Sequence, residues 1–508
     1  MNTKVRLRFA PSPTGPLHIG GVRTALYNYL FAQKHGGDFI LRIEDTDQTR
    51  FVPGAEEYIV ESLAWLGITF NEGVHLGGTH APYRQSERKE IYRQYADQLI
   101  ASGNAYYAFD SSEQLDLLRK EGEASKKIFQ YDCFTRKNLV NSLTLSAEET
   151  QARLDNMEPY VIRFKMPEDE LVELTDLIRG HVSVNTSTLD DKVLYKSDGM
   201  PTYHLANVVD DYLMKISHVI RGEEWLPSAP LHVLLYKKFG WIDNMPQFAH
   251  LPLLLKPDGN GKLSKRDGDR LGFPVFPLQW KDPKTGEISS GYRESGYFPE
   301  AVINILSLLG WNPGTNQEIM SMDELADLFS LDKITKSGAK FDLEKSKWFN
   351  HQYLIRRDDL ELAGLLLPML SEKGVETSAE ILAPIIGLVK ERAQFVSELV
   401  PQTIYFFQQP ISYNDQVIKK RWKEDTAIHL TKISEIISSV SPFDHLQAHD
   451  LVIEYIQTNQ LNMGQIMNCL RLALVGDAMG PDLFEIVRLI GVKEVNSRIS
   501  KAINTITI

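Results

Sequence analysis

The sequence predicts an α/β fold followed by an all-helical region, and two observations carry this prediction. The first is the order of patterns near the start of the chain. Residues 5–9 alternate as a strand does, a Pro/Gly-dense turn follows at 11–16, and apolar residues then recur at helical spacing. After a glycine pair, residues 38–44 have the pattern of a second strand, which completes a βαβ unit. The second observation is that the apolar residues beyond residue 298 keep helical spacing, without strand-like alternation.

The turn between the first strand and its helix has the composition of a phosphate-binding site. His18, Gly20 and Gly21 stand where the helix begins. Glycine at a helix N-terminus lets backbone N–H groups approach an anion, and the helix dipole favours negative charge there. The segment therefore indicates a Rossmann-like sheet that binds a nucleotide.

Composition limits the class of protein. The chain has 508 residues, 43% of them hydrophobic and 24% charged, which predicts a soluble protein of three or more structural units. The longest nearly apolar stretch, 301–309, is too short to cross a bilayer, so we expect no membrane partner. Residues 1–4 lead directly into the first strand and leave no room for a signal peptide. Two distant cysteines, Cys133 and Cys469, indicate a reducing compartment, and we expect a cytoplasmic location.

The net charge of −12 disfavours a nucleic-acid partner, although net charge does not describe how charge is distributed. Five lysines lie within 333–347, and a basic run at 419–421 precedes Trp422. Either run alone is more typical of a solvated helix face than of a binding surface. Only a strip formed by both would make a surface for nucleic acid.

Four motifs, in this order, resemble those of bacterial-type glutamyl-tRNA synthetases, members of the class I aminoacyl-tRNA synthetase family. They are A-P-S-P-T-G-P-L-H-I-G at 10–20, R-I-E-D-T-D at 42–47, T-Y-H-L-A-N-V-V-D-D at 202–211 and K-L-S-K-R at 262–266. The first and last contain the two class signatures, and either alone would be a weak match. The resemblance covers most of the chain, except the segments 124–159 and 279–296, of which the second is expected to be an exposed hairpin or loop.

The resemblance implies five parts. A Rossmann-like catalytic domain occupies 1–105 and 190–270, interrupted by an acceptor-stem-binding domain at 106–189. A mostly helical stem-contact domain at 271–380 and an all-helical anticodon-binding domain at 381–508 follow. Glutaminyl relatives use β-barrels to bind the anticodon, so the helical spacing here favours the glutamyl type.

Some relatives hold a zinc ion in the inserted domain through a C-x-C motif and further ligands. Here Tyr107 and Phe109 stand where those cysteines would be, and Cys133 is isolated. A structural zinc site needs about four nitrogen or sulfur ligands, so we expect no zinc.

The implied reaction activates L-glutamate with ATP and Mg²⁺, giving glutamyl-adenylate, and transfers the glutamyl group to the 3′-terminal adenosine of tRNA(Glu). It needs positioning and charge stabilisation and no protein nucleophile. The matching catalytic residues are His18, Lys262 and Lys265. The matching ATP-binding residues are Pro11, Thr14, His18, Gly20, Gly21, Lys262, Ser264 and Lys265.

The side-chain carboxylate of glutamate invites an arginine fork, which binds it through two hydrogen bonds. The resemblance assigns the amino-acid pocket to Arg8, Ser12, Glu44, Tyr203, Asn207 and Arg221, with Glu44 meeting the α-ammonium group. The alternative for Arg8 and Glu44 is that they pair with each other. Trp225 either caps this pocket or belongs to the core. Arg392 either reads an anticodon base or is an ordinary surface arginine.

Other functions stay open. One alternative is an enzyme that charges tRNA(Gln) as well as tRNA(Glu), a choice that depends on anticodon contacts in the family. A nucleotidyltransferase of the same superfamily, forming a small-molecule adenylate, would share both signatures but would not need a helical RNA-binding half. A non-catalytic tRNA-binding protein would be free to lose His18, Lys262 or Lys265, and all three are present. Family members are usually monomers, and we expect a monomer here.

Overall fold

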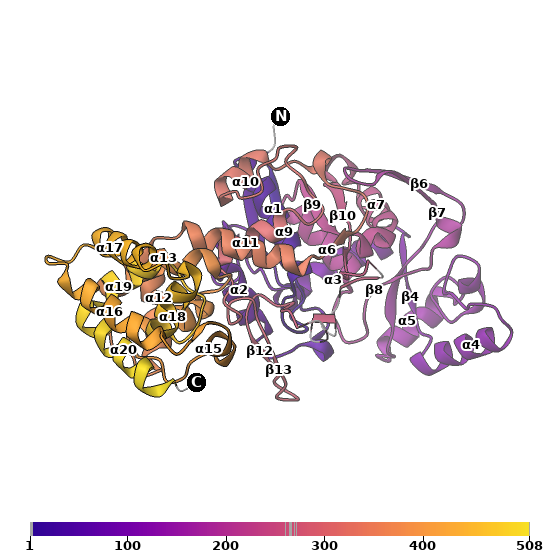
Figure 1. Ribbon diagram of the computed structural model, residues 1–508. Helices are drawn as coiled ribbons and strands as arrows, with labels where there is room; N and C mark the ends of the chain where they lie inside the picture. The colour runs from indigo at the N-terminus through magenta and orange to yellow at the C-terminus, as the bar shows by residue number, and fades with distance from the viewer. Residues whose placement is uncertain (1–3, 260, 264–266, 269, 271, 507–508) are drawn as a thin grey trace. The chain divides into compact units, whose positions relative to one another are not determined.

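The computed structural model describes residues 4–259, 261–263, 267–268, 270 and 272–506. The chain forms two compact units. The first contains residues 1–295 and 299–343, and the second contains 296–298 and 344–508. The first is α/β and the second is helical, as the strand and helix labels of Figure 1 show.

A twisted sheet is the centre of the first unit. On one side, β1 (Arg6–Phe9), β2 (Asp38–Leu41) and β3 (Glu72–Gly73) are parallel neighbours. On the other, β9 (His218–Gly222), β10 (Gln247–Leu251) and β6 (Leu171–Asp176) are parallel, with β7 (Gly180–Asn185) antiparallel at the edge. The backbone N–H of Ser217 donates to the carbonyl of Arg6 at 2.9 Å and joins the two groups.

The three-stranded sheet β3-β2-β1 and the four-stranded sheet β9-β10-β6-β7 meet at the Ser217–Arg6 hydrogen bond, with β1 beside β9, which confirms the Rossmann-like prediction. From β1 the chain moves outward to β2 and then β3, and from β9 it moves in the opposite direction to β10. In open α/β sheets, ligands bind outside the carboxyl ends of the strands at such a switch point. The crevice between the ends of β1 and β9 is therefore the expected site.

Helix α1 (Ile19–Lys34) begins at this crevice. Val22, Leu26 and Leu30 are fully buried, as their spacing predicts. The helix ends before Gly36, whose φ of 57° is a left-handed conformation that glycine adopts readily. The remaining helices of the sheet layers are α2 (Ala55–Trp65), α3 (Lys89–Ala101), α6 (Tyr203–Leu213) and α7 (Ala229–Lys238).

The segment between the two halves of the sheet contains β4 (Ala105–Ala108), α4 (Ser112–Ala124), α5 (Ala147–Asp155) and β5 (Val161–Phe164), and β5 pairs with both β4 and β8 (Val193–Tyr195). Residues 161–166 and 182–185 alternate in sequence as short strands do, and β5 and β7 form at these positions. Strand β6 was not predicted, although L-V-E-L-T-D alternates between exposed and buried residues. The sequence allows either Ser111 or Ser112 as the cap of α4, and the structure selects Ser111, whose hydroxyl accepts from the Gln114 N–H.

The positions that hold zinc ligands in some relatives belong to an aromatic cluster. The rings of Tyr107 and Phe109 lie 5.0 and 6.2 Å from the ring of Tyr160. The Arg153 guanidinium lies over Phe109.

The rest of the first unit contains α9 (Pro299–Ser307), α10 (Met322–Leu328), the paired strands β11 (Leu254–Leu255) and β14 (Ala339–Lys340), and a hairpin of β12 (Trp280–Lys281) and β13 (Ile288–Ser289). The hairpin expected within 279–296 is present, but it is not simply exposed. Trp280 is buried edge-to-face against Tyr58 of α2. The prediction that no strand lies beyond residue 298 is wrong at β14. Its two residues form a strand because they pair with β11, which is distant in sequence.

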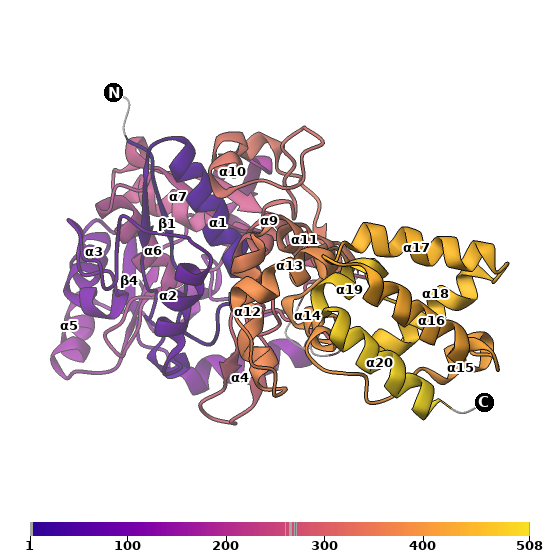
Figure 2. The same ribbon diagram turned by 60° about the vertical axis from the view of Figure 1, so that its left-hand side comes forward.

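The second unit is helical, as predicted (Figure 2). Its helices are α11 (Leu343–Arg356), α12 (Asp359–Ser371), α13 (Ala379–Val389), α14 (Leu399–Thr403), α15 (Asp415–Arg421), α16 (Thr426–Ser439), α17 (His445–Thr458), α18 (Met463–Val475), α19 (Leu483–Ile490) and α20 (Val492–Thr505). A core from α16 to α20 includes Leu430, Ile437, Val452, Leu470 and Val487. The apolar spacing across 381–407 predicts one amphipathic helix. This prediction is wrong, because 3₁₀ turns at 390–392 and 396–398 separate α13 from α14.

In the part of the chain that the structure describes, no helix is both long and apolar enough to span a bilayer.

Candidate active site

A pocket of about 620 Å³ opens at the crevice where β1 and β9 end. Its walls come from the β1–α1 turn, the start of α1, the end of β9 and the segments around Glu44, Tyr203 and Lys262. The structure brings together in this lining all the predicted glutamate and ATP residues that it describes: Arg8, Pro11, Ser12, Thr14, His18, Gly20, Gly21, Glu44, Tyr203, Asn207, Arg221 and Lys262. The predicted residues Ser264 and Lys265 lie outside the described residues.

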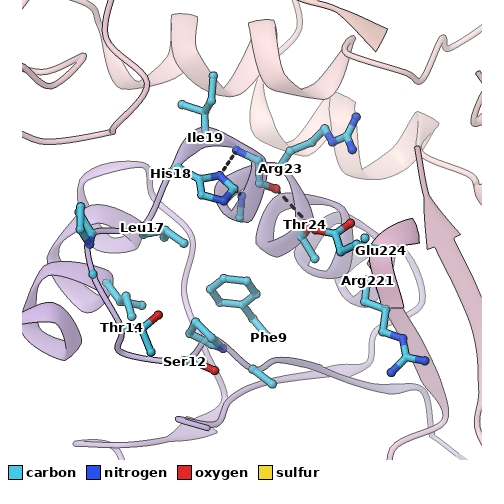
Figure 3. A pocket seen from close by; sticks show the side chains of 18 of the residues that line it. Phe9, Ser12, Thr14, Leu17, His18, Ile19, Arg23, Thr24, Arg221 and Glu224 are labelled. Atoms are coloured by element: carbon cyan, nitrogen blue, oxygen red, sulfur yellow. Dashed lines mark hydrogen bonds between the residues drawn. The ribbon is translucent and has the colours of Figure 1, made fainter. Parts of the chain in front are cut away.

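His18 is the N-cap of α1, and its ring faces the pocket (Figure 3). The ring nitrogen Nδ1 accepts from the backbone N–H groups of Gly20 and Gly21, at 3.0 and 3.2 Å. Accepting requires a lone pair on Nδ1, so the proton of the neutral ring is on Nε2. The pocket walls limit solvation of the ring and, with the positive charge of Lys262, lower the pKa of His18. The imidazole is therefore neutral at pH 7, with a donor available at Nε2.

Gly20 and Gly21 allow the chain to turn tightly around this ring. A Cβ atom on Gly20 would lie 2.8 Å from Cε1 and 2.9 Å from Nδ1 of His18. A Cβ atom on Gly21 would lie 2.6 Å from Cδ1 of Leu17. All three distances are shorter than real Cβ contacts. At Gly20 the added atom would meet the His18 ring itself, so the position of the ring requires glycine there, whereas at Gly21 the end of the Leu17 side chain would have to move.

We predict that Gly20→Ala lowers the rate of ATP-dependent amino-acid activation by about 10²-fold, because the new methyl group displaces the His18 ring. Pyrophosphate release measures this rate. The matched control is Gly364→Ala in α12, where a Cβ meets no atom within 4 Å. This control should keep full activity and gain about 1 kcal/mol of stability, since alanine favours helices. Full activity of Gly20→Ala would contradict the role of the glycine.

Below the pocket floor lies a cluster of buried charges. Nε and Nη2 of Arg8 donate to the two carboxylate oxygens of Asp211, at 3.0 and 3.1 Å. Arg42 donates to Asp211 at 2.8 Å and to Glu44 at 3.0 Å, and Asn207 donates to Glu44 at 3.0 Å. The expected alternative, in which Arg8 pairs with Glu44, is wrong: each has a different partner.

The two carboxylates of this cluster differ in pKa. Burial alone would raise the pKa of Asp211, but the charges and hydrogen bonds of Arg8 and Arg42 hold it below its usual value. For Glu44, burial dominates over Arg42 and Arg8, and the pKa is raised. The protein therefore offsets only part of the cost of burying the Glu44 carboxylate, and a cationic ligand beside it would offset the rest.

Sequence analysis assigned no role to Arg42, Asp210 or Asp211, although all three lie within the quoted motifs. Asp210 accepts hydrogen bonds from the side chains of Arg88 and Tyr92 at 2.8 and 2.7 Å. These residues hold the pocket floor together. A sequence signal for them exists: Asp210 and Asp211 stand in α6 among apolar residues that face the core, where an unpaired carboxylate would be costly.

Arg221, at the end of β9, is a buried cation whose partners are neutral. Its Nη1 donates to the Tyr203 hydroxyl at 2.7 Å, its Nε to Nε2 of His250 at 3.0 Å, and its Nη2 to the Trp225 carbonyl at 3.3 Å. No carboxylate pairs with it among the described residues. A buried charge without a counter-ion is costly, so this side of the pocket favours an anionic ligand.

Trp225 lies over the same end of the pocket. Its ring is 4.3 Å from that of Tyr203, and 40% of the residue is exposed. The core alternative for Trp225 is therefore wrong, and the residue lines the pocket. On another side, Lys262 forms an ion pair with Glu224 at 3.0 Å, which places a lysine ammonium near His18.

The second unit contains a separate pocket, also of about 620 Å³. Arg392, in a 3₁₀ turn, lines it. Its other lining residues include Tyr405, Gln408, Gln409, Ile411 and Met479, of which the last two are highly exposed. Arg392 therefore lies at a concave surface with amide and aromatic side chains.

Comparisons with known proteins agree with this geometry. Residues 4–348 match the model for tRNA synthetases class I (E and Q), catalytic domain, and residues 361–503 match an anticodon binding domain. The chain is 60% identical to a glutamate–tRNA ligase of Porphyromonas gingivalis over 100% of both chains. It is 58% identical to that of Flavobacterium johnsoniae, again over 100% of both.

A crystal structure of a glutamate tRNA ligase from Elizabethkingia meningosepticum, in complex with its amino acid, superposes with a TM-score of 0.97. The two sequences are 53% identical, over 99% of this chain and 100% of that one. The chain belongs to the family of class I tRNA synthetases for glutamate and glutamine.

Proposed function

We propose that this protein is a glutamate–tRNA ligase, which activates L-glutamate with ATP and transfers it to tRNA(Glu). The observation that carries the proposal is one pocket with an unbalanced arginine at one end and a helix N-terminus with a histidine donor at the other. Full-length relatives at about 60% identity carry the name glutamate–tRNA ligase, which supports the same activity.

At the amino-acid end, Arg221 binds the side-chain carboxylate of glutamate. Arg8 already donates two hydrogen bonds to Asp211, so its guanidinium is not free to bind the substrate carboxylate in the same way. It contributes mainly positive potential to the pocket. Glu44 binds the α-ammonium group, which supplies the cation that its raised pKa calls for. Ser12, Tyr203 and Asn207 complete the pocket.

At the nucleotide end, ATP places its phosphates between the start of α1 and Lys262. The Nε2–H of His18 donates to a phosphate oxygen, and the backbone amides at the helix start add positive potential. The α-carboxylate of glutamate attacks the α-phosphorus, and the bond to pyrophosphate breaks. Lys262 and, by the family resemblance, Lys265 stabilise the charge on the leaving pyrophosphate. Pro11, Thr14, Gly20 and Gly21 line the ATP site, and the resemblance also assigns Ser264 to ATP binding. Mg²⁺ enters as part of the substrate, bound to the phosphate oxygens of ATP.

In the second step, the ribose hydroxyl of the terminal adenosine of tRNA attacks the activated carbonyl, and AMP leaves. We place anticodon reading in the second unit at the pocket that Arg392 lines. An arginine beside amide and aromatic side chains suits a base that is turned out of the anticodon loop. Such a base can stack on the aromatic ring or the guanidinium while its edge hydrogen-bonds to the amides. We expect the enzyme to work as a monomer and, because it serves translation, in the cytoplasm.

Charging of separate tRNA(Glu) and tRNA(Gln) transcripts with labelled glutamate, ATP and Mg²⁺ tests the proposal. Charging of tRNA(Glu) is the expected result, and charging of tRNA(Glu) alone would mark a discriminating enzyme. Charging of both would keep the activity and show the broader specificity. Pyrophosphate release without charging of either would favour a small-molecule adenylate instead. Arg392→Ala, in the same assay, should raise the KM for tRNA and leave the KM for glutamate unchanged.

A further inference from the structure

We propose that Asp176 and His250 are positioning residues that hold the guanidinium of Arg221 in its binding orientation and so set the affinity for glutamate. The proposal rests on the role of Arg221 in the proposed function. Neither residue lines the pocket. Both act through Arg221.

The three side chains form a chain of hydrogen bonds away from solvent. Nε of Arg221 donates to Nε2 of His250 at 3.0 Å, and Nδ1 of His250 lies 2.6 Å from Oδ2 of Asp176. The side chains of His250 and Asp176 are both 0% exposed. Ordered hydrogen bonds of this kind orient a functional group, since water cannot compete for them.

The direction of each hydrogen bond follows from Arg221. A guanidinium only donates, so Nε2 of His250 must accept, and the proton of the neutral ring is then on Nδ1. That proton is donated to Asp176. Burial lowers the pKa of His250 despite its bond to Asp176, which agrees with a neutral ring. The state of the imidazole is therefore defined from both sides.

Asp176 is held rigidly at the turn between β6 and β7. Its Oδ1 accepts from the backbone N–H groups of Ile178 and Arg179, at 2.9 and 2.8 Å, and from that of His250 at 3.3 Å. Strand β6 also pairs directly with β10, which carries His250. Both oxygens of Asp176 therefore act only as acceptors, in a frame of backbone donors.

These contacts leave Arg221 ready for a carboxylate. An arginine has five N–H groups, and the bonds to His250, Tyr203 and Trp225 use three of them. One N–H remains on each Nη atom, and two such groups match the two oxygens of a carboxylate. Because His250 occupies Nε, the substrate must be bound through the Nη atoms, and a rotation of the guanidinium would break the pair.

Asp176→Asn tests this arrangement with a change of no more than one atom and one charge. The asparagine NH₂ group must replace one of two acceptors. At the Oδ1 position the NH₂ group would oppose three backbone N–H donors, whereas at the Oδ2 position it would oppose only one imidazole nitrogen. The NH₂ group therefore takes the position that faces His250. The imidazole proton then moves to Nε2, where it opposes the Nε–H of Arg221 and displaces the guanidinium. The analogous aspartate-to-asparagine change in serine proteases leaves the wrong histidine tautomer in the same way.

In the charging assay at saturating tRNA, Asp176→Asn should raise the KM for glutamate by about 10–100-fold, the usual effect of losing an orienting partner. The KM for ATP should change less than about twofold, which a general structural defect would not achieve. Asp169→Asn, an exposed change just before the same hairpin, is the matched control and should behave as the original protein.

His250→Gln and His250→Leu provide a second, independent pair. A glutamine can accept from Arg221 through its oxygen and donate to Asp176 through its nitrogen, so it should keep the KM for glutamate within a few-fold. Leucine leaves the Nε–H of Arg221 unpaired and should raise that KM as Asp176→Asn does. This pair decides the question if Asp176→Asn fails to fold.

An unchanged KM for glutamate in folded Asp176→Asn and His250→Leu would overturn the proposal, as would equal increases in the KM values for glutamate and ATP. The unmodified protein, in the same assay, separates the proposed function from the positioning role. If it does not charge tRNA with glutamate, the proposed function fails. If it does and these variants match it, only the positioning role fails.

Discussion

Replacing Arg221 by lysine is expected to raise the KM for glutamate by about 10²–10³-fold, with the KM for ATP unchanged. Lysine keeps the positive charge but cannot reproduce the planar fork, and its ammonium cannot bond Tyr203, His250 and the Trp225 carbonyl while also binding a carboxylate. Breaking a buried ion pair costs about 3–5 kcal/mol, or about 10²–4 × 10³-fold in affinity at about 1.4 kcal/mol per tenfold, and we expect the lower part of this range because lysine keeps the charge.

The control for this variant is Arg119→Lys. Arg119 forms an exposed ion pair with Asp116 in α4, with side chains 57% and 60% exposed. Surface pairs contribute about 0–1 kcal/mol, so this change should leave stability and activity unaltered. Steady-state charging at varied glutamate and varied ATP measures both constants. A KM for glutamate that stays within a few-fold in Arg221→Lys would show that another group binds the side-chain carboxylate.

Replacing His18 by alanine should lower the rate of adenylate formation by about 10²–10³-fold. The change removes the Nε2–H donor from the phosphate site, and losing one such donor from a charge-stabilising site has this effect. It also removes the N-cap of α1, whose Nδ1 accepts from Gly20 and Gly21. Loss of a cap costs about 0.5–2 kcal/mol, so the alanine variant should also be less stable.

His18→Asn separates these two roles. Asparagine is among the best N-caps and should recover most of the lost stability, but its shorter side chain does not reach as far into the pocket. We expect a melting temperature close to that of the original protein, with a rate still reduced at least about tenfold. Recovery of both quantities would show that His18 acts only as a cap.

The pH dependence of the same step follows from the state of His18. Its pKa is lowered from 6.5, so the neutral, donating ring persists below that pH and is lost only as pH falls further. The rate of adenylate formation should therefore stay flat as pH decreases from 8 through 6.5. A decrease centred at 6.5 that disappears in His18→Asn would mean that the ring titrates normally.

Local sequence determined much of this protein. The βαβ unit at the N-terminus, the helical second unit and the glycines beside His18 all follow from spacing and backbone preference, which act over a few residues. The twelve predicted pocket residues that the structure describes also meet in one cavity, because their motifs lie on segments whose ends converge at the same edge of the sheet. Local spacing also misled the prediction of one helix across 381–407. The apolar spacing continues there through 3₁₀ turns, one of which contains Arg392, so spacing alone does not show where the helix ends.

Tertiary structure decided how the charges are paired. Arg8 and Asp211 are far apart in sequence, as are Asp176 and His250, and no local pattern relates them. Strand β6 brings Asp176 beside β10, and only that pairing connects an aspartate of the inserted segment to the arginine of the pocket. Sequence alone therefore identified the pocket residues by their motifs, whereas the buried partners that orient them depend on long-range packing. A buried charge is stable only beside the partner that the complete fold places next to it.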